Sequence, residues 1–396
     1  MKEEQKFKVI IVGGGTGGIA VASRLAKRFP AGSIALFEPS MAHYYQPLWT
    51  LVGAGICSLA ESRRSTEEFI PAGVTWVREK VLSFQPNDNT LTAESGQFSY
   101  DALVLSPGIQ VNWDGIEGLR ETLGKNNVVS NYSEDVVEKT WESFQSFSGG
   151  RALFTFPATP IKCGGAPQKI MYLMDDYLRR QGLREKSSVE FMSAADSIFA
   201  VPKYKEALDD LIARRGIRTH FKRNLIAVDG ARKVAVFKDM ATNQEHEESF
   251  DFLHVTPPMS APNFIKESEL ANQAGWIDVD KHSLQHNKFK NVFALGDASS
   301  LPTSRTGAAI RKQAPALVEN LCSYLKGAPL IAKYDGYTSC PIVTGYGKLI
   351  LAEFDYDSKP CETFPFDQSK ERWSMYQLKR HVLPVMYWQG MMRGRA

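Results

Sequence analysis

The chain has 396 residues, of which 43% are hydrophobic and 23% are charged. This length predicts two or three domains with a sizeable core, and the composition excludes disordered, collagen-like and small disulfide-scaffold proteins. A net charge of +3 is too small to predict nucleic-acid binding, and five cysteines are too few for a secreted disulfide framework. No run approaches the roughly 20 apolar residues that span a bilayer.

The first elements form one βαβ unit. A buried strand is predicted over 7–12, followed by Gly-Gly-Gly-Thr-Gly-Gly and a helical pattern over 19–29. A second buried strand over 33–37 ends in Glu38. Alternation of apolar and polar residues predicts further sheet or hairpin strands over 74–84 and 89–105.

A second series of strands and helices follows. Strands are predicted over 152–156, 189–192 and 253–256, and helices over 133–147, 168–180 and 203–215. A last strand over 292–295 precedes a helical pattern over 306–325, which Pro315 should kink or split. Strands that alternate with helices in two blocks predict an α/β fold with largely parallel sheets.

We therefore predict two Rossmann-like dinucleotide-binding domains and a C-terminal appendage. The first domain is expected to be discontinuous, over 1–112 and 259–330, and the second domain is expected over 113–258. Residues 331–396 break the alternating pattern and are rich in aromatic residues, proline and methionine, so they form the appendage.

The first block carries a dinucleotide motif. Gly13, Gly15 and Gly18 follow a predicted strand and open a helix, and Glu38 stands 20 residues after Gly18. Glycines allow a tight turn and a close approach of pyrophosphate to backbone N–H groups, and the carboxylate can bind ribose hydroxyls. A glycine-rich turn without a ligand is the alternative, but both strands and the acid favour a dinucleotide site.

The glycines leave FAD and NAD both open. Gly296-Asp297 ends the strand 292–295 just before a helix, which resembles the second FAD signature of flavoproteins with two dinucleotide domains. Residues 106–108 (Ser-Pro-Gly) occupy the place where such proteins usually carry Ala-Thr-Gly. Gly296-Asp297 alone is equally a plain turn, but together with the first motif it favours FAD.

The second block lacks a phosphate loop. Residues 157–167 contain three prolines, which cannot donate N–H groups, and Ser193 follows the next strand in place of an acid. Cys163 occupies this loop beside Lys162 and close to the predicted helix start, a setting that favours a thiolate. The alternative is a buried inert thiol, which we expect for Cys57, Cys322 and Cys361.

Long stretches of the chain resemble the sulfide:quinone oxidoreductase family of mitochondria and some bacteria. They are HYYQPLWTLVGAG (43–55), SNYS (130–133), FTFPATPIKCGGAPQKIMYL (154–173), HVTPPMSAP (254–262), GDASSLPTS (296–304), KYDGYTSCPIVTGYGKLILAEFDY (333–356) and ETFPFDQSKERWSMY (362–376). By sequence pattern alone, Cys340 is an isolated turn cysteine. The resemblance instead implies that Cys163 and Cys340 face each other over the flavin, bridged as a disulfide or trisulfide.

The resemblance implies a reaction as well. Hydrosulfide attacks the bridged sulfur at Cys340, the resulting persulfide passes its sulfur to an acceptor such as glutathione or sulfite, and electrons pass through FAD to a quinone. The chain has no cysteine between Cys57 and Cys163, which fits the two-cysteine branch and makes long polysulfide a less expected product. The expected cofactor-binding residues are Gly13, Gly15, Gly18, Glu38, Gln46, Gly108, Gly296, Asp297 and Lys348.

The last 27 residues predict a basic amphipathic helix. Residues 370–396 contain six lysines and arginines against one acid, interleaved with aromatic and aliphatic side chains. Such a helix suits the membrane interface, with a bend at Pro384, and family resemblance implies monotopic attachment. The alternative is a helix that packs on its own protein.

Quinone is apolar, so its channel should be lined by apolar side chains. Candidates are Ile342, Tyr346, Phe354 and Phe364. Lys348 either stabilises reduced flavin or quinol, or is a solvated surface lysine.

The expected partners are hydrogen sulfide, a quinone, a sulfur acceptor, a peripheral membrane surface and a second copy of the chain in a homodimer, without nucleic acid or metal. The start of the chain shows no secretory or mitochondrial leader, which favours the cytoplasmic face of a bacterial membrane over the mitochondrial inner membrane. The alternatives are a type II NADH:quinone oxidoreductase and a flavin-bound sulfur carrier without turnover.

Overall fold

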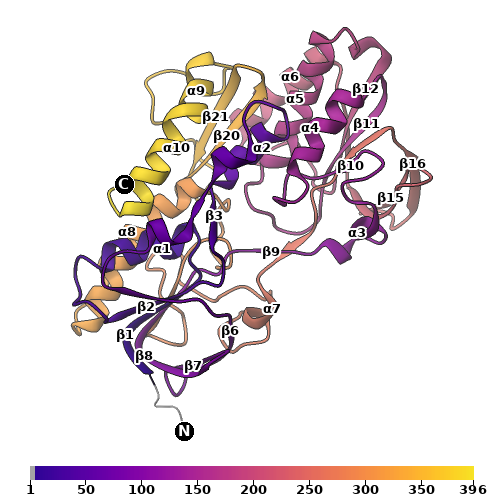
Figure 1. Ribbon diagram of the computed structural model, residues 1–396. Coiled ribbons are helices and arrows are strands. Elements are labelled where there is room, and N and C mark those ends of the chain that lie inside the picture. Colours follow the sequence, from indigo (N-terminus) through magenta and orange to yellow (C-terminus); the bar gives the residue numbers. More distant parts are fainter. Residues whose placement is uncertain (1–4) are drawn as a thin grey trace.

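A computed structural model describes residues 5–396, and Figure 1 shows two αβ blocks joined to a C-terminal helical segment. Within the described residues, none of the helices combines the length and hydropathy needed to cross a bilayer. The α/β architecture with two Rossmann-like sheets is the predicted one.

The first sheet has seven strands, in the order β5-β2-β1-β8-β7-β6, and β19 pairs with the last three residues of β8, beyond the part that pairs with β7. Its strands are β1 (Gln5–Val12), β2 (Ile34–Phe37), β5 (Val74–Val77), β6 (Val81–Gln85), β7 (Thr90–Ala93), β8 (Gly96–Leu105) and β19 (Val292–Ala294). β1, β2, β5, β8 and β19 run parallel, and β6 and β7 pair antiparallel. The central strands are apolar on both faces, as a parallel sheet covered on both sides requires.

The second sheet has five parallel strands, in the order β10-β17-β11-β12-β13. They are β10 (Val128–Val129), β11 (Gly150–Phe156), β12 (Ser187–Ser193), β13 (Arg218–Phe221) and β17 (Phe252–His254). Helices α4 (Val137–Ser146), α5 (Ala166–Arg180) and α6 (Pro202–Arg215) belong to this block. An antiparallel sheet of β14 (Arg223–Asp229), β15 (Val234–Asp239) and β16 (Glu245–Ser249) adjoins it.

The two blocks are joined where β9 (Gln110–Val111) pairs antiparallel with β18 (Met259–Ser260). These two strands lie at the two points where the chain passes between the sheets (Figure 1). The predicted domain boundaries remain a prediction. The remaining short elements are β3 (Ala42–Tyr44), β4 (Arg63–Ser65), α2 (Trp49–Val52), α3 (Leu119–Thr122) and α7 (Asn263–Lys266).

Helices α1 (Thr16–Leu25) and α8 (Gly307–Leu325) pack against each other beside the first sheet. Of the expected kink or split at Pro315 in the second of these helices, the split is wrong, because α8 runs unbroken through it. Pro315 is exposed, so water can satisfy the carbonyl that loses its helical hydrogen bond. The predicted helix over 19–29 also ends earlier, at Leu25.

The C-terminal appendage begins with a hairpin of β20 (Thr338–Gly345) and β21 (Lys348–Phe354), and β20 packs against α5. Helical turns follow over residues 373–393, including α9 (Trp373–Gln377) and α10 (Leu383–Val385), and Figure 1 shows this yellow segment ending beside α1. One face of these turns is buried on the protein through Met375, Tyr376, Tyr387, Trp388, Met391 and Met392. This face therefore packs on the protein, which was the alternative to a helix at the membrane interface. Trp373, Val382 and Val385 point outward and are 53% to 68% exposed.

Candidate functional site

Four predicted nucleotide elements meet at one edge of the first sheet. The last residues of parallel strands lie in register there, with Val12 beside both Phe37 and Leu105, and Leu105 beside Ala294. The loop after β1, Glu38 after β2, residues 106–108 after β8 and Gly296-Asp297 after β19 therefore converge. Parallel α/β sheets bind nucleotides at this carboxyl edge.

The loop after β1 is shaped by close backbone contacts. Gly15 is the N-cap of α1, and a Cβ placed on Gly18 would lie only 1.8 Å from the Gly13 carbonyl oxygen, so a side chain cannot fit. The Gly14 N–H donates to Glu38 Oε2 at 2.7 Å, and burial raises the pKa of that carboxyl. The loop and acid thus fit the pyrophosphate and ribose of a dinucleotide.

Asp297 lies half-buried at the same edge. Its backbone carbonyl accepts a hydrogen bond from Arg305 Nε at 2.7 Å. Burial raises the pKa of the Asp297 carboxyl, and the positive charges of Lys162 and Arg305 oppose that rise. Gly296 donates its N–H to Gln313 on α8, and Gly108 has a left-handed backbone in the turn after β8.

The loop after β11 brings Cys163 to this edge. Cys163 has a φ of +53°, a left-handed backbone that costs a residue with a side chain about 1 kcal/mol. Hydrogen bonds join this loop to residues 304 and 305, which follow β19 of the first sheet. The Cys163 N–H donates to the Arg305 carbonyl at 2.9 Å, and the Gly164 N–H donates to Ser304 Oγ at 3.3 Å. The segment that follows Asp297 therefore sets the position of this cysteine.

Cys163 and Cys340 meet, with their Sγ atoms 3.2 Å apart. Cys340 lies on β20 and is fully buried, whereas Cys163 is partly exposed. Residues 304–306, which we call the bridging segment, also contact β20. Thr338 Oγ1 donates to the Ser304 carbonyl at 3.1 Å and contacts Thr306 Oγ1 at 2.8 Å. Residues 304–306 thus fix both sulfurs at the flank of the dinucleotide edge.

Lys169 places a buried positive charge on the sulfur pair. Its Nζ donates to Cys163 Sγ at 3.4 Å from the second turn of α5. The pKa of the Cys163 thiol lies well below its ordinary value because Cys340 hydrogen-bonds to it and Lys169 attracts the thiolate. The pKa of the Cys340 thiol is raised, because it donates that hydrogen bond and is buried. These opposite shifts favour the thiolate at Cys163 and the thiol at Cys340.

A second buried lysine comes from the C-terminal segment. Lys379 Nζ donates to the Pro47 carbonyl at 2.9 Å, and the side chain is 2% exposed. Burial, together with the charge on Lys169, lowers the pKa of Lys379 to about 7, while Cys163, Cys340 and Cys57 oppose the shift.

Sequence reasoning missed Lys169, Lys379 and the bridging segment. Lys169 lies one and a half turns beyond Cys163 near the start of α5, a signal that helix periodicity could have provided. Lys379 gave no local signal, because its contact with the site depends on where the C-terminal segment folds.

The other predicted residues occupy varied positions. Gln46 accepts a hydrogen bond at 2.5 Å from Nζ of Lys162, the residue that precedes Cys163 in the chain. Lys348 is exposed at the start of β21, beyond the hairpin turn from Cys340. Their cofactor roles remain predictions.

The four apolar candidates are spread along the appendage. Ile342 is fully buried near Gly165, and Phe354 packs edge to face on Phe199. Tyr346 donates its hydroxyl to the Ala54 carbonyl, and Phe364 stacks on Phe366. Only Ile342 is thus placed beside the cysteine pair by its contacts.

The remaining cysteines lack this setting. Burial raises the pKa of the Cys57 thiol to about 11 and also raises that of Cys361, and Cys322 is buried in the α8 core. Within residues 5–396, no group of three His, Cys, Asp or Glu side chains is arranged to hold a metal.

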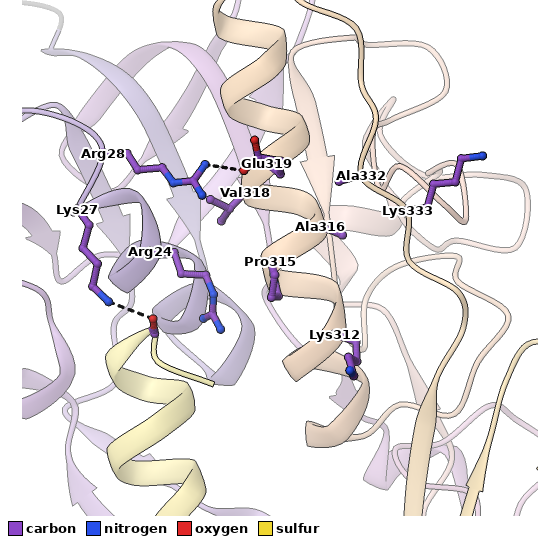
Figure 2. A pocket seen from close by; sticks show the side chains of 11 residues that line it. Arg24, Lys27, Arg28, Lys312, Pro315, Ala316, Val318, Glu319, Ala332 and Lys333 are labelled. Carbon is purple, nitrogen blue, oxygen red and sulfur yellow. Dashed lines mark hydrogen bonds and ion pairs between the residues drawn. The ribbon is translucent and has the colours of Figure 1, made fainter. Parts of the chain in front are cut away.

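A cavity of about 590 Å³ lies over the exposed face of α8, away from this site. Figure 2 shows its cationic side chains, of which Arg28 pairs with Glu319 and Lys27 bonds to a backbone carbonyl of the C-terminal segment. The cavity adjoins the last turn of α1, opposite to the glycine loop, and neither Cys163 nor Cys340 lines it.

Known proteins resemble this chain over its whole length. A family model described as pyridine nucleotide-disulphide oxidoreductase matches residues 7–141. The mitochondrial sulfide:quinone oxidoreductase of Mus musculus is 48% identical over 98% of this chain and 87% of its own length. That of Dictyostelium discoideum is 50% identical over 100% of this chain and 88% of its own length. The X-ray structure of the sulfide:quinone oxidoreductase from Aquifex aeolicus shares the fold, with a TM-score of 0.83 at 20% identity over 98% of this chain and 92% of that chain.

Gly165→Ala should separate the two sulfurs. A Cβ on Gly165 would lie 2.4 Å from Cys340 Sγ, so the sulfur must move. We expect the rate at which a mild oxidant joins Cys163 to Cys340 to fall about tenfold, measured by mass spectrometry of the crosslinked peptides. Gly164→Ala is the matched control, because its Cβ meets no atom within 4 Å. Equal rates in the two variants would contradict the packing argument.

Lys169→Met should raise the pKa of Cys163, because the thiolate loses its buried cation. Peptide mapping of the reduced protein after treatment with iodoacetamide measures how far Cys163 is alkylated at each pH. The midpoint of this pH profile should move upward by about one pH unit or more. Lys205→Met, at an exposed ion pair with Asp209, should leave the midpoint in place. A midpoint unchanged in Lys169→Met would refute the assigned role of the lysine.

Proposed function

Because the chain belongs to the sulfide:quinone oxidoreductase family, we propose that it oxidises hydrogen sulfide through Cys163 and Cys340 and reduces a quinone through FAD. The observation that carries this proposal is the 3.2 Å separation of two sulfurs that are 177 residues apart in sequence, beside a dinucleotide edge. The buried Lys169 adds the charge that such sulfur chemistry needs.

The asymmetry of the pair gives the direction of attack. Hydrosulfide attacks Cys340 Sγ of the oxidised pair, a new S–S bond forms there, and the bond to Cys163 breaks. The leaving sulfur is the one with the lower pKa, and Lys169 holds it as a thiolate. Cys340 is left as a persulfide, whose outer sulfur passes to an acceptor such as glutathione or sulfite.

FAD is the flavin that the nucleotide edge suits best. The glycine loop and Glu38 would hold the adenosine half, and Gly296-Asp297 with Gly108 would hold the flavin half. When bound, FAD would supply a two-electron acceptor for the electron pair that the re-forming cysteine bridge releases and a two-electron donor for the quinone. Ile342 is the quinone-lining candidate that its contacts place beside the cysteines, and Phe354, Tyr346, Phe364 and Lys348 stay candidates without such a contact.

The second block argues against NADH as the donor. Its loop after β11 contains Pro157 and Pro160, and Ser193 ends β12 where an acid would bind ribose. No glycine-rich phosphate loop follows β11. A type II NADH:quinone oxidoreductase needs that second nucleotide site, so rapid bleaching of the flavin by NADH would reverse this assignment.

Membrane attachment is proposed through the outer face of the C-terminal segment. Trp373, Val382 and Val385 are exposed there, while the opposite face is fastened to the protein. The bacterial membrane expected from the sequence finds no support in the two relatives that are 48% and 50% identical, both of which are mitochondrial proteins, and we propose the mitochondrial inner membrane.

Cys163→Ala and Cys340→Ala should each abolish sulfide oxidation, because either substitution removes one end of the bridge. The yellow flavin should remain bound, since neither side chain forms the glycine loop. Anaerobic titration with sulfide, recording the flavin spectrum and then the reduction of a short-chain quinone, measures both steps. Cys361→Ala is the control, and sulfide should bleach its flavin as it does in the wild type. Full turnover in either test variant would end the two-cysteine mechanism, and bleaching without quinone reduction in the wild type would favour a sulfur carrier.

Combined replacement of Trp373, Val382 and Val385 by serine should weaken binding to lipid vesicles. Removing one exposed aromatic and two aliphatic groups should lower the vesicle-bound fraction at least about tenfold in flotation, because each contributes about 1.5 kcal/mol or more when buried. Leu82→Ser with Met240→Ser is the matched control, since both side chains are exposed elsewhere on the surface. Equal flotation of the two variants would exclude this face as the attachment surface.

A further inference from the structure

The end of the chain is fastened along the helix that carries the glycine loop. Ser23 Oγ on α1 donates to the Met392 carbonyl at 2.7 Å, and Lys27 Nζ donates to the Gly394 carbonyl at 3.0 Å. Met391 and Met392 are buried in this contact. Figure 1 shows the C-terminus lying beside α1, far in sequence from the loop that begins this helix.

Tyr387 carries this contact to the loop itself. Its side chain is 3% exposed, and its hydroxyl lies 2.8 Å from Thr16 Oγ1 and 2.5 Å from His43 Nε2. Thr16 is the first residue of α1, inside the run Gly13–Gly18. One hydroxyl of the C-terminal segment thus joins the nucleotide loop to β3.

Tyr387 and His43 form a hydrogen-bonded cluster with the glycine loop. Burial lowers the pKa of His43 to about 4, so the imidazole is neutral at physiological pH, and a hydrogen bond with the Gly14 backbone opposes that shift. The tautomer of the neutral ring decides whether His43 Nε2 donates to the Tyr387 hydroxyl or accepts from it, and either hydroxyl of the Tyr387 and Thr16 pair can donate to the other. The cluster therefore meets the glycine loop at Thr16 and at Gly14.

The ring of Tyr387 is held independently of its hydroxyl. It packs on Tyr45 with ring centroids 4.4 Å apart, and the neighbouring Trp388 stacks on Phe69 at 5.1 Å. A phenylalanine would keep these ring contacts and lose only the two hydrogen bonds. Packing and hydrogen bonding can therefore be separated by experiment.

We propose that Tyr387 is a positioning residue for the dinucleotide, and that the C-terminal segment latches the glycine loop through it. The hydroxyl restrains Thr16 and, through His43, Gly14, so the loop keeps the backbone arrangement that grips a pyrophosphate. This inference rests on the flavin site of the proposed function but not on its sulfide chemistry. Retention of the flavin then depends on a residue at the far end of the chain.

Release of flavin from purified holoenzyme tests this role. The readout is the first-order rise of free-flavin fluorescence after dilution, at a fixed temperature below unfolding. Tyr387→Phe should release flavin about tenfold faster than the wild type, as the loss of two buried hydrogen bonds predicts. Tyr376→Phe is the matched control, because this buried tyrosine of the same segment makes no hydroxyl bond to the loop within the described residues. It should release flavin at the wild-type rate.

Substitutions at Thr16 provide an independent readout. Thr16→Val should release flavin faster, whereas Thr16→Ser keeps the hydroxyl and should restore slow release. In the double variant of Tyr387→Phe with Thr16→Val, the increase in the rate of flavin release should be smaller than the product of the two single increases, because both changes break the same hydrogen bond. Wild-type release in Tyr387→Phe, equal acceleration in Tyr376→Phe, or fully multiplicative effects would each overturn the proposal.

The same samples separate this inference from the proposed function. Bleaching of the wild-type flavin by sulfide reports the proposed function, whereas the rate of flavin release from Tyr387→Phe reports the latch. If the wild type fails to bleach while Tyr387→Phe still loses flavin quickly, the sulfide function fails and the latch stands. If bleaching is normal and release is unchanged, the latch alone is refuted.

Discussion

The structure depends on one bridge between distant segments. The residues after the Gly296-Asp297 turn hold Cys163 by a backbone hydrogen bond on one side and Thr338 on the other. The positions of both sulfurs therefore depend on the segment that follows β19 at the nucleotide edge, as well as on the contact between the two sulfurs. The sulfur pair, with one member on a loop and the other on β20, thereby has a defined position beside the cofactor edge.

The second block illustrates how a fold can keep its shape and change its chemistry. Its five parallel strands retain the carboxyl edge at which a nucleotide would bind. Prolines, which have no N–H to donate to a phosphate, lie in the loop after β11, and a cysteine with a left-handed backbone lies in the same loop. Lys169, whose charge could stabilise a phosphate, stabilises a thiolate here instead. The electrostatic need is the same, an anion in a partly buried site, and only its chemical identity has changed.

The C-terminal segment serves two surfaces at once. Its inner face supplies Lys379 near the sulfurs and Tyr387 at the glycine loop, and its outer face leaves large apolar side chains exposed. The inner contacts use hydrogen bonds to backbone and side chains of the first block, so the segment is part of the folded body. A surface for lipid and a support for the cofactor therefore share one stretch of chain.

The local elements of the first block could be predicted from sequence, because they depend on spacing over a few tens of residues. The apolar runs of β1 and β2, the glycine loop and Glu38 follow from strand length, helix length and the turn between them. The missing phosphate loop of the second block was equally visible, because proline removes a donor wherever it lies. The meeting of Cys163 and Cys340 had no local signal and was reached through family resemblance. Only the tertiary structure placed Lys169, Lys379 and residues 304–306 around them, and only it decided which face of the C-terminal segment is buried. Amphipathic spacing states that a helix has two faces, but the surface that each face meets is set by packing between segments hundreds of residues apart.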